Sequence, residues 1–348
     1  MVGCAAVLCS GGRRSCMKVL VTGCAGRVGE AVTAHLVSQG FDIRGVDVAE
    51  SFGLDIEYRP CDLLDSEALK PHVDGVDVVL HLAAIPAPGR GANADIFKIN
   101  TAGTFNVFDA CAQVGVLRVV VASSINAIGY YFGAVPFEID YLPVDEGHPK
   151  LTSDAYSFSK QVTEDIGAYF WQRDGVANAC LRFGAGLRPV EELRGQRDGF
   201  VAARGLVERL LETAEADRAL EVARMRGAYD EERRKRMYEN KLGRSPDLAD
   251  AEHRLMSLRH NYFSFVTLED ACRGMELALT AGYKGSHPLF IVDRENTLVM
   301  NAAELANLVY PDVDVRGELS GKQSFVSPGK AKELIGFETE MHASELYG

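Results

Sequence analysis

One stretch, residues 18–29, constrains the fold of this chain more than any other. A short apolar run over residues 18–21 is typical of a buried parallel strand, and it leads into three glycines, Gly23, Gly26 and Gly29. A helical pattern follows from residue 27 to about residue 38. Strand, glycine turn and helix in this order form the context that a dinucleotide-binding turn requires.

Each glycine has its own task in such a turn. Gly23 permits the tight bend, Gly26 lets the backbone approach a pyrophosphate, and Gly29 lets the helix pack close to the strand. The first helical N–H groups, beginning with Arg27 and Val28, then face the phosphates, where the helix dipole favours negative charge. We therefore predict that this turn binds a dinucleotide.

Acidic residues follow the next two expected strands. Asp47 ends a strand over residues 41–47 and lies 24 positions after Gly23. This is close to the spacing of about 20 expected for a ribose-binding acid. Its carboxylate would accept hydrogen bonds from the ribose hydroxyls and repel a 2′-phosphate, which selects NAD over NADP. Asp62 follows a short third strand and could pair with the adenine amino group, with Leu63 beside it.

A fourth buried strand begins at residue 76 and runs into Leu82, Ala83 and Ala84. Small residues at the carboxyl end of a strand leave room for a ligand at the crevice of the sheet. His81 lies within this apolar sequence, and we interpret it as a core histidine. Since strands alternate with helices through residue 123, the pattern predicts an α/β fold with a doubly wound parallel sheet.

The fifth expected strand, residues 117–122, leads into Ser123 and Ser124, and a helix begins near Tyr156. Tyr156 and Lys160 are four positions apart and therefore share one helix face. The lysine ammonium, together with the positive nicotinamide of NAD, would lower the pKa of the phenol toward neutrality. Tyr156 could then accept a proton from a substrate hydroxyl that the serine holds, and Lys160 could also reach the nicotinamide ribose.

In these features the chain resembles an extended short-chain dehydrogenase/reductase of the NAD-dependent epimerase/dehydratase family. The matching residues are Asp47 and the stretches 22–29, 61–63, 81–84, 100–104, 123–124, 156–160 and 181–183. The resemblance implies a Rossmann domain that binds NAD, with Asn100 among its cofactor residues. It also implies a catalytic Ser-Tyr-Lys trio, a smaller substrate lobe and a homodimer. The family places its catalytic serine five residues before a glycine, which selects Ser124 and leaves Ser123 as the alternative.

Departures from the family pattern narrow the chemistry. Sugar 4,6-dehydratases typically have Thr-Asp-Glu after the fifth strand, which supplies an acid and a base for the elimination of water. This chain has Ser124-Ile125-Asn126 there, so dehydration is disfavoured. Residues 181–185 lack the amide that many UDP-sugar epimerases use to hold the diphosphate. Residues 122–131 are similar to a uronate dehydrogenase motif, with the asparagine displaced by one position and the histidine absent. Ser123 and Asn126 are accordingly candidate substrate contacts.

The second half of the chain is expected to form most of the substrate lobe. We place the NAD-binding domain at residues 17–185 and the lobe at 186–348, with a charged helical insertion at about 205–258. A strand over residues 262–267 and a helix to about residue 280 are expected to return to the Rossmann domain. Arg188, Arg204 and Arg259 are candidates for binding a carboxylate or phosphate. The mixed charges of residues 230–236 indicate a solvated helix.

Composition excludes several classes of function. The formal net charge of −12 argues against a general nucleic-acid binder, and no apolar run reaches membrane-spanning length. The eight cysteines are scattered without a Cys-x-x-Cys pair, which indicates reduced core thiols and a cytoplasmic location. We expect no metal. Residues 1–16 do not fit a signal peptide and are interpreted as a disordered extension or an upstream start.

Two enzymatic outcomes remain open at this point. An epimerase acting on a sugar or nucleotide sugar is slightly favoured as the family default. A uronate or aldose dehydrogenase with net NADH release is the alternative. A third hypothesis, a non-catalytic NAD(H)-binding regulator, is disfavoured because Ser124, Tyr156 and Lys160 are all present.

Overall fold

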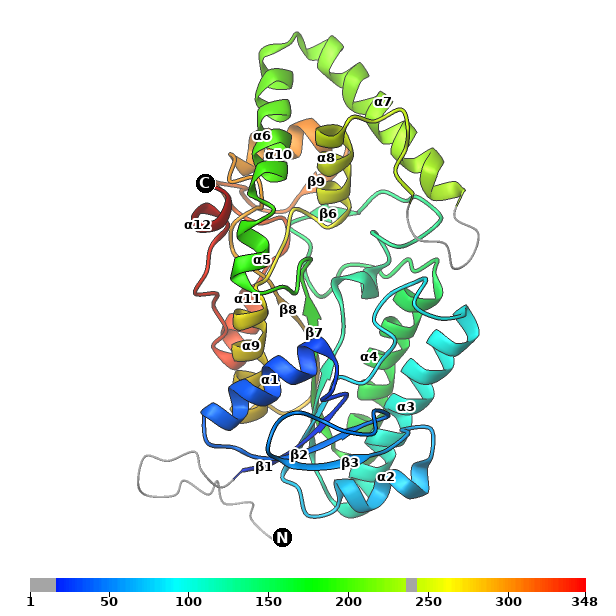
Figure 1. Ribbon diagram of the computed structural model, residues 1–348. Helices are drawn as coiled ribbons and strands as arrows, with labels where there is room; N and C mark the ends of the chain where they lie inside the picture. Colours follow the sequence, from blue (N-terminus) through cyan, green and yellow to red (C-terminus); the bar gives the residue numbers. More distant parts are fainter. Residues whose placement is uncertain (1–16, 236–242) are drawn as a thin grey trace.

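A seven-stranded parallel sheet forms the centre of the computed structural model, which describes residues 17–235 and 243–348 (Figure 1). The expected extension, residues 1–16, lies outside the described residues. The strand order β3-β2-β1-β4-β5-β7-β8 reverses direction between β1 and β4, as in a doubly wound Rossmann sheet, so the predicted fold class is confirmed. The strands are β1 Lys18–Thr22, β2 Asp42–Asp47, β3 Glu57–Pro60, β4 Val78–His81, β5 Arg118–Ala122, β7 Ala177–Phe183 and β8 Ser286–Ile291.

Helices cover both faces of this sheet (Figure 1). One face packs on α2 Ser66–Val73, α3 Asn93–Val114 and α4 Ala155–Asp174. The other packs on α1 Arg27–Ser38, α9 Leu268–Thr280 and α11 Gly329–Ile335. Strands β1, β4, β5 and β7 are buried along nearly their whole length, which explains their continuous apolar sequences. The described cysteines, Cys24, Cys61, Cys111, Cys180 and Cys272, are buried free thiols, as predicted for core positions.

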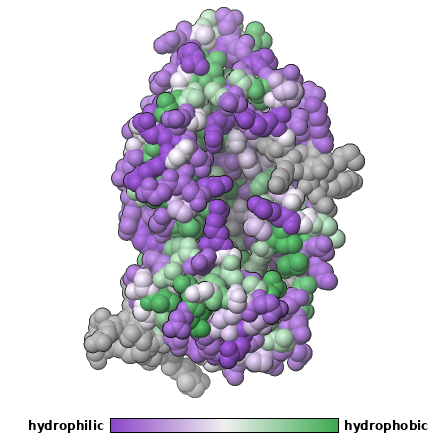
Figure 2. Space-filling model, viewed as in Figure 1, coloured by the Kyte–Doolittle hydropathy of each residue, from purple (hydrophilic) through white to green (hydrophobic). Residues whose placement is uncertain are grey.

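A smaller lobe lies beyond the carboxyl ends of the strands and has its own apolar core (Figure 1). It contains a two-stranded sheet, β6 Tyr141–Leu142 with β9 Asp314–Val315. Its helices are α5 Val190–Arg194, α6 Arg197–Glu212, α7 Glu215–Arg234, α8 Asp250–His260, α10 Ala302–Val309 and α12 Ala343–Tyr347. Figure 2 shows a hollow on one face at mid-height, between this lobe and the part that contains the sheet. No helix among the described residues is long and apolar enough to cross a membrane.

The strand expected over residues 262–267 is absent from the described structure, and that prediction is wrong. Tyr262 and Phe263 adopt positive φ angles of 55° and 50°, because the chain turns sharply where α8 ends. Thr267 makes only an isolated bridge to Arg188 before α9 begins. Both aromatic side chains are buried, so their apolar character reflects packing in the lobe and not a sheet. The strand that does join the sheet is β8.

Candidate active site

The glycine turn follows β1 and leads into α1. Gly23 has a φ of +73°, and a Cβ atom on it would lie 2.6 Å from the backbone nitrogen of Ala83. A Cβ on Gly29 would lie 2.1 Å from the carbonyl oxygen of Gly23. Both residues must therefore be glycine for the fold itself. Gly26 differs, since the nearest atom to its Cβ would be 3.4 Å away and the residue is exposed.

This turn fits a dinucleotide. Because the protein itself leaves room at Gly26, the bare backbone there is available for close approach by a phosphate. The amino end of α1 has no side-chain cap, so its first N–H groups, at Arg27 and Val28, are left for a ligand. The guanidinium of Arg27 donates to the carbonyl of Leu187, at 3.0 Å, in the second half of the chain.

Asp47, at the end of β2, lies directly against the glycine turn. Its carboxylate accepts hydrogen bonds from the backbone nitrogens of Ala25, at 3.0 Å, and Ala49, at 3.2 Å. Asp62 accepts a hydrogen bond from the backbone nitrogen of Leu64 at 2.9 Å and is exposed. Leu63 is buried beneath α3. Leu82, Ala83 and Ala84 follow β4, which pairs with β1, so they lie beside the turn.

Ser124, Tyr156 and Lys160 meet at the carboxyl end of β5 and the start of α4. Ser124 begins a short 3-10 helix, η1 Ile125–Ile128, and its hydroxyl is hydrogen bonded to the Tyr156 hydroxyl. The ammonium of Lys160 donates to the carbonyl of Ala122 at 2.7 Å and lies 5.8 Å from the centre of the Tyr156 ring. All three predicted catalytic side chains are buried, with exposed fractions of 8%, 6% and 5%.

Burial dominates the charge balance of the protein groups at this site. Burial raises the pKa of Tyr156 to about 12, and the hydrogen bond with Ser124 lowers it only in part. Burial also lowers the pKa of Lys160 to about 8. Among the protein's own groups, desolvation of the phenolate therefore dominates. The expected shift of the phenol pKa toward neutrality required the positive nicotinamide of NAD as well as Lys160, and it stays a prediction.

The two neighbouring serines have separate partners. The hydroxyl of Ser123 donates to Glu164 at 2.8 Å, and Glu164 is paired with the buried Arg182 at 2.8 Å and with Lys150 at 2.9 Å. Although burial opposes ionisation of Glu164, these cations hold its pKa below the usual range. Ser123 is thus bound to an ion pair, and Ser124 is the serine that reaches Tyr156.

Asn126, a candidate substrate contact, lies beside Ser124. Its backbone nitrogen and its side-chain nitrogen lie 3.1 Å and 3.3 Å from the Ser124 hydroxyl. Its side-chain oxygen is buried and has no hydrogen-bond partner among the described residues. An unsatisfied buried acceptor next to Ser124 is available for a ligand hydroxyl.

Two other polar residues have structural partners. Asn100 accepts from the backbone nitrogen of Ile85 at 2.7 Å and donates to the carbonyl of Ile85 at 3.1 Å and to Ser159 at 2.9 Å. It therefore ties the loop after β4 to α4. His81 lies between the hydroxyls of Thr22, at 2.7 Å, and Thr104, at 2.9 Å, and burial lowers its pKa to about 3. It is a neutral core histidine.

The basic residues proposed as anion ligands are mostly occupied elsewhere. Arg188 is half exposed and pairs with Glu192 at 3.0 Å. Arg204 donates to the carbonyl of Tyr347. Arg259 is buried, where it donates to the carbonyl of Val309 at 2.7 Å and to Glu138 at 2.8 Å. These contacts indicate that Arg204 and Arg259 support the lobe, and the binding of a ligand anion by either residue stays a prediction.

The charged segment 230–236 is only partly solvated, and its last residue lies outside the described ranges. Arg233 is completely buried, which contradicts the prediction of a solvated helix face. Glu164 was also missed, although its spacing of four and eight residues from Lys160 and Tyr156 places it on their helix face. No group of three or more His, Cys, Asp or Glu residues in the described part of the chain could hold a metal ion.

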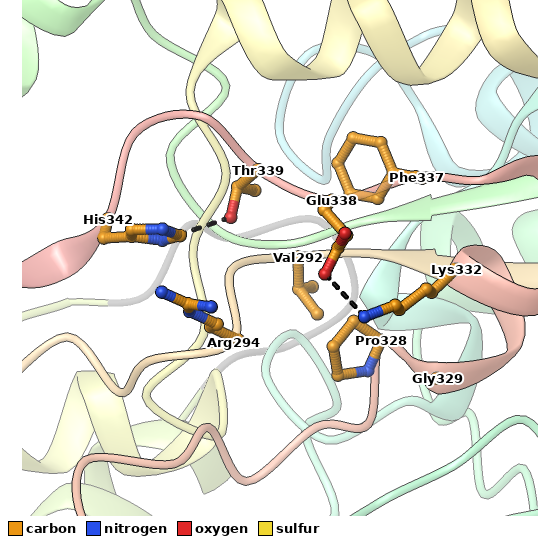
Figure 3. A pocket seen from close by; sticks show the side chains of 9 residues that line it. All are labelled: Val292, Arg294, Pro328, Gly329, Lys332, Phe337, Glu338, Thr339 and His342. Carbon is orange, nitrogen blue, oxygen red and sulfur yellow. Dashed lines mark hydrogen bonds and ion pairs between the residues drawn. The ribbon is translucent and has the colours of Figure 1, made fainter.

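A separate pocket of about 210 Å³ lies near the carboxyl end of the chain (Figure 3). Lys332 pairs there with Glu338 at 2.8 Å, and His342 lies 3.4 Å from the hydroxyl of Thr339. The side chain of Arg294 also points into this region (Figure 3). The pocket contains none of the predicted site residues, and its lysine–glutamate pair is exposed.

Comparison with known proteins agrees with this geometry. The model of the NAD dependent epimerase/dehydratase family matches residues 19–219, more than half of the chain. A uronate dehydrogenase of Pseudomonas syringae pv. tomato is 29% identical over 171 residues, which are 48% of this chain and 59% of that protein. An L-arabinose 1-dehydrogenase (NAD(P)(+)) of Haloferax volcanii is 31% identical over 186 residues, 52% of this chain and 71% of that protein. The match thus spans less than two thirds of the uronate dehydrogenase.

Solved structures share the fold. A short-chain dehydrogenase/reductase superfamily protein from Agrobacterium tumefaciens with bound NAD has a TM-score of 0.60 and 24% identity, covering 95% of this chain and 94% of that one. A UDP-glucose 4-epimerase from Thermotoga maritima has a TM-score of 0.58 and 19% identity, covering 95% and 96%. The chain therefore belongs to the NAD-dependent epimerase/dehydratase family of enzymes, whose cofactor is NAD.

Proposed function

We propose that this protein is an NAD-dependent dehydrogenase that oxidises a hydroxyl group of a sugar at Ser124, Tyr156 and Lys160. The observation that carries the proposal is the position of Lys160, whose ammonium is held by the carbonyl of Ala122 at 2.7 Å and lies 5.8 Å from the centre of the Tyr156 ring, with Ser124 hydrogen bonded to that tyrosine. All three groups are buried, so a substrate there would be shielded from water.

The residues divide the work in this way. Ser124 holds the substrate oxygen, and Tyr156 accepts its proton as the carbon is oxidised. Lys160 is bonded to the carbonyl of Ala122, which fixes the ammonium close to the tyrosine ring. NAD, when bound, supplies the hydride acceptor and a positive charge that favours the ionised phenol. The glycine turn and Asp47 would hold the dinucleotide.

Net dehydrogenation is favoured over epimerisation by the relatives. Uronate, arabinose and glucose-6-phosphate dehydrogenases are 28–31% identical to this chain over about half of its length. Solved UDP-sugar epimerases, at 19–20% identity, share the fold, and so do solved uronate dehydrogenases at 16–18% identity, so the preference comes from the sequence matches and not from the solved structures. Residues 122–131 also resemble the uronate dehydrogenase motif. We therefore propose that uronates, which are aldoses with a terminal carboxylate group, are the first substrate class to test.

The test is a comparison of Tyr156→Phe with wild type, with NAD and D-glucuronate or D-galacturonate as substrates. We expect wild type to form NADH and the variant to lose about 10²–10⁴ in kcat, because the proton acceptor is removed. The affinity for NAD, measured by calorimetry, should not change. Tyr283→Phe is the control, since Tyr283 is as buried as Tyr156 and its hydroxyl has no hydrogen-bond partner among the described residues.

Unchanged turnover in Tyr156→Phe would contradict the mechanism. Near-stoichiometric NAD in freshly purified wild type, with no net NADH from any sugar, would instead favour the epimerase, which must regenerate its cofactor in place.

We also propose a homodimer formed through α3 and α4. These helices expose apolar side chains that single-chain packing leaves uncovered: Ile99, Phe105, Phe158, Tyr169 and Trp171, with exposed fractions of 36–46%. Phe158 stacks on Phe97, which joins the two helices in one apolar surface. Phe158→Glu should convert the dimer to a monomer in sedimentation experiments, and a wild-type monomer would contradict the proposal.

A further inference from the structure

The charged helix α7 sends one arginine into the protein interior. Arg233 has an exposed fraction of 0%, whereas its neighbours Arg234 and Lys235 are exposed. It lies beyond residue 219, where the family match ends. The carboxyl end of α7 lies beside the chain that follows η1 (Figure 1). The hydrogen-bond partners of this buried charge therefore lie in the chain that follows η1.

Arg233 is bonded to backbone carbonyls that lie about a hundred positions earlier. Its Nε atom donates to the carbonyl of Gly133 at 3.0 Å, and its Nη2 atom donates to the carbonyls of Tyr130 and Gly133, both at 2.8 Å. Its Nη1 atom lies 3.5 Å from Asp230. Since a buried guanidinium is costly without such partners, the bonds fix these two carbonyls relative to α7.

The carbonyls belong to residues 129–135, which we call the η1 loop because it follows η1 directly. Within it, the ring of Phe132 contacts the ring of Tyr156 edge-on, with centres 5.6 Å apart and planes at 89°. A Cβ on Gly129 would lie 2.6 Å from the carbonyl of Leu151, so the start of the loop rests on the chain before α4. The backbone nitrogen of Val135 donates to Ser153 at 3.2 Å at its end.

The same loop is held a second time by the end of α8. The ring of Tyr130 stacks on His260 and on Tyr262, with ring centres 4.8 Å and 5.1 Å apart. The guanidinium of Arg259 lies 5.7 Å from the centre of the Tyr130 ring. The η1 loop is thus held at Tyr130 by aromatic stacking on His260 and Tyr262, and at Tyr130 and Gly133 by the hydrogen bonds of Arg233.

From these contacts we propose that Arg233 is a positioning residue, which holds the η1 loop so that Phe132 stays against the catalytic Tyr156. This inference rests on the proposed function for its effect on turnover. It gives the charged insertion a role in the active site, because α7 supports the loop next to the proposed catalytic residues. Loss of the guanidinium would release the carbonyls of Tyr130 and Gly133 and let Phe132 move away from the tyrosine.

The experiment compares Arg233→Met with Arg234→Met, a matched control that removes an exposed arginine from the next position of the same helix. Amide hydrogen exchange of full-length protein is followed over residues 129–135. Turnover is measured with NAD and D-glucuronate or D-galacturonate. We expect faster exchange in the η1 loop and a fall in kcat of about tenfold or more for Arg233→Met, with unchanged affinity for NAD. Arg234→Met should behave as wild type.

Arg233→Lys keeps one buried cation but cannot donate to both carbonyls in the same geometry. Its kcat and its loop exchange should lie between those of wild type and Arg233→Met, and it carries the test if Arg233→Met does not fold. Exchange and kcat in a folded Arg233 variant equal to those of Arg234→Met would overturn the proposal. The exchange measurement needs no substrate, so it tests the contact of Arg233 with the loop even if the wild-type protein oxidises no sugar.

Discussion

The glycine turn and the end of α7 both depend on a close approach to backbone carbonyls, but over very different sequence separations. In the turn, the atom that a side chain at Gly29 would strike is the carbonyl of Gly23, within the same short stretch. At α7, Arg233 is bonded to Gly133 and Tyr130, which are 100 and 103 positions away. The first arrangement is local, and the second exists only once the chain has folded.

This difference explains why the glycine turn can be predicted from the sequence and the contacts of Arg233 cannot. A local contact fixes residue types at fixed spacings, so the glycines mark the turn in any sequence that forms it. A buried arginine that donates to distant carbonyls leaves no such mark, because a carbonyl belongs to every residue type. Within this charged segment, nothing in the sequence distinguishes the buried Arg233 from the exposed Arg234 and Lys235.

The largest effect is expected at the ion pair of Glu164 and Arg182, which, like the contacts of Arg233, forms only when the chain folds. Both are buried and paired with each other at 2.8 Å, so Glu164→Gln would leave the arginine charge uncompensated. We expect the free energy of unfolding, measured in urea, to fall by about 3–5 kcal/mol.

Glu192→Gln is the control, because it breaks an arginine–glutamate pair that is about half exposed. That substitution should change the free energy of unfolding by less than about 1 kcal/mol. Equal losses in the two variants would contradict the view that burial makes the first pair important.

Two alanine substitutions test the local contacts of the glycine turn. Gly29→Ala places a Cβ 2.1 Å from the Gly23 carbonyl, and we expect it to lower the free energy of unfolding by about 1–3 kcal/mol. Gly26→Ala meets nothing closer than 3.4 Å, so the fold should stay stable while NAD binding weakens. Urea unfolding and calorimetric titration with NAD measure the two effects. A stable Gly29→Ala protein that binds NAD would refute the packing role.

The sequence predicted the sheet well because the first half of the chain repeats strand and helix in order. It also placed Ser124, Tyr156 and Lys160 on elements that the structure brings together. The prediction of a strand at residues 262–267 failed because the apolar side chains there pack in the core of the lobe. Positive φ angles at Tyr262 and Phe263 also interrupt the extended backbone.

Charge at the site was harder to predict than position. The pKa of Tyr156 depends on how completely the phenol is buried, and burial is a property of the whole fold and not of the Tyr-x-x-x-Lys spacing. Arg259 was likewise assigned to a ligand because its type suits an anion. Its partners within the chain, Val309 and Glu138, come from segments far apart in the sequence.

His81 gives the smallest and most graded test, because it joins the local turn to a distant helix through Thr22 and Thr104. Burial lowers its pKa from 6.5 to about 3, so below pH 6.5 the unfolded chain binds a proton that the folded protein does not. Its stabilising effect is therefore present above the unfolded pKa and is lost as the pH falls, by at most about 1.4 kcal/mol per pH unit. His81→Gln should make the free energy of unfolding less dependent on pH between about 6.5 and 5, where most carboxylates stay ionised. The same pH slope in wild type and variant would mean that His81 is protonated within the fold, against its buried contacts with both threonines.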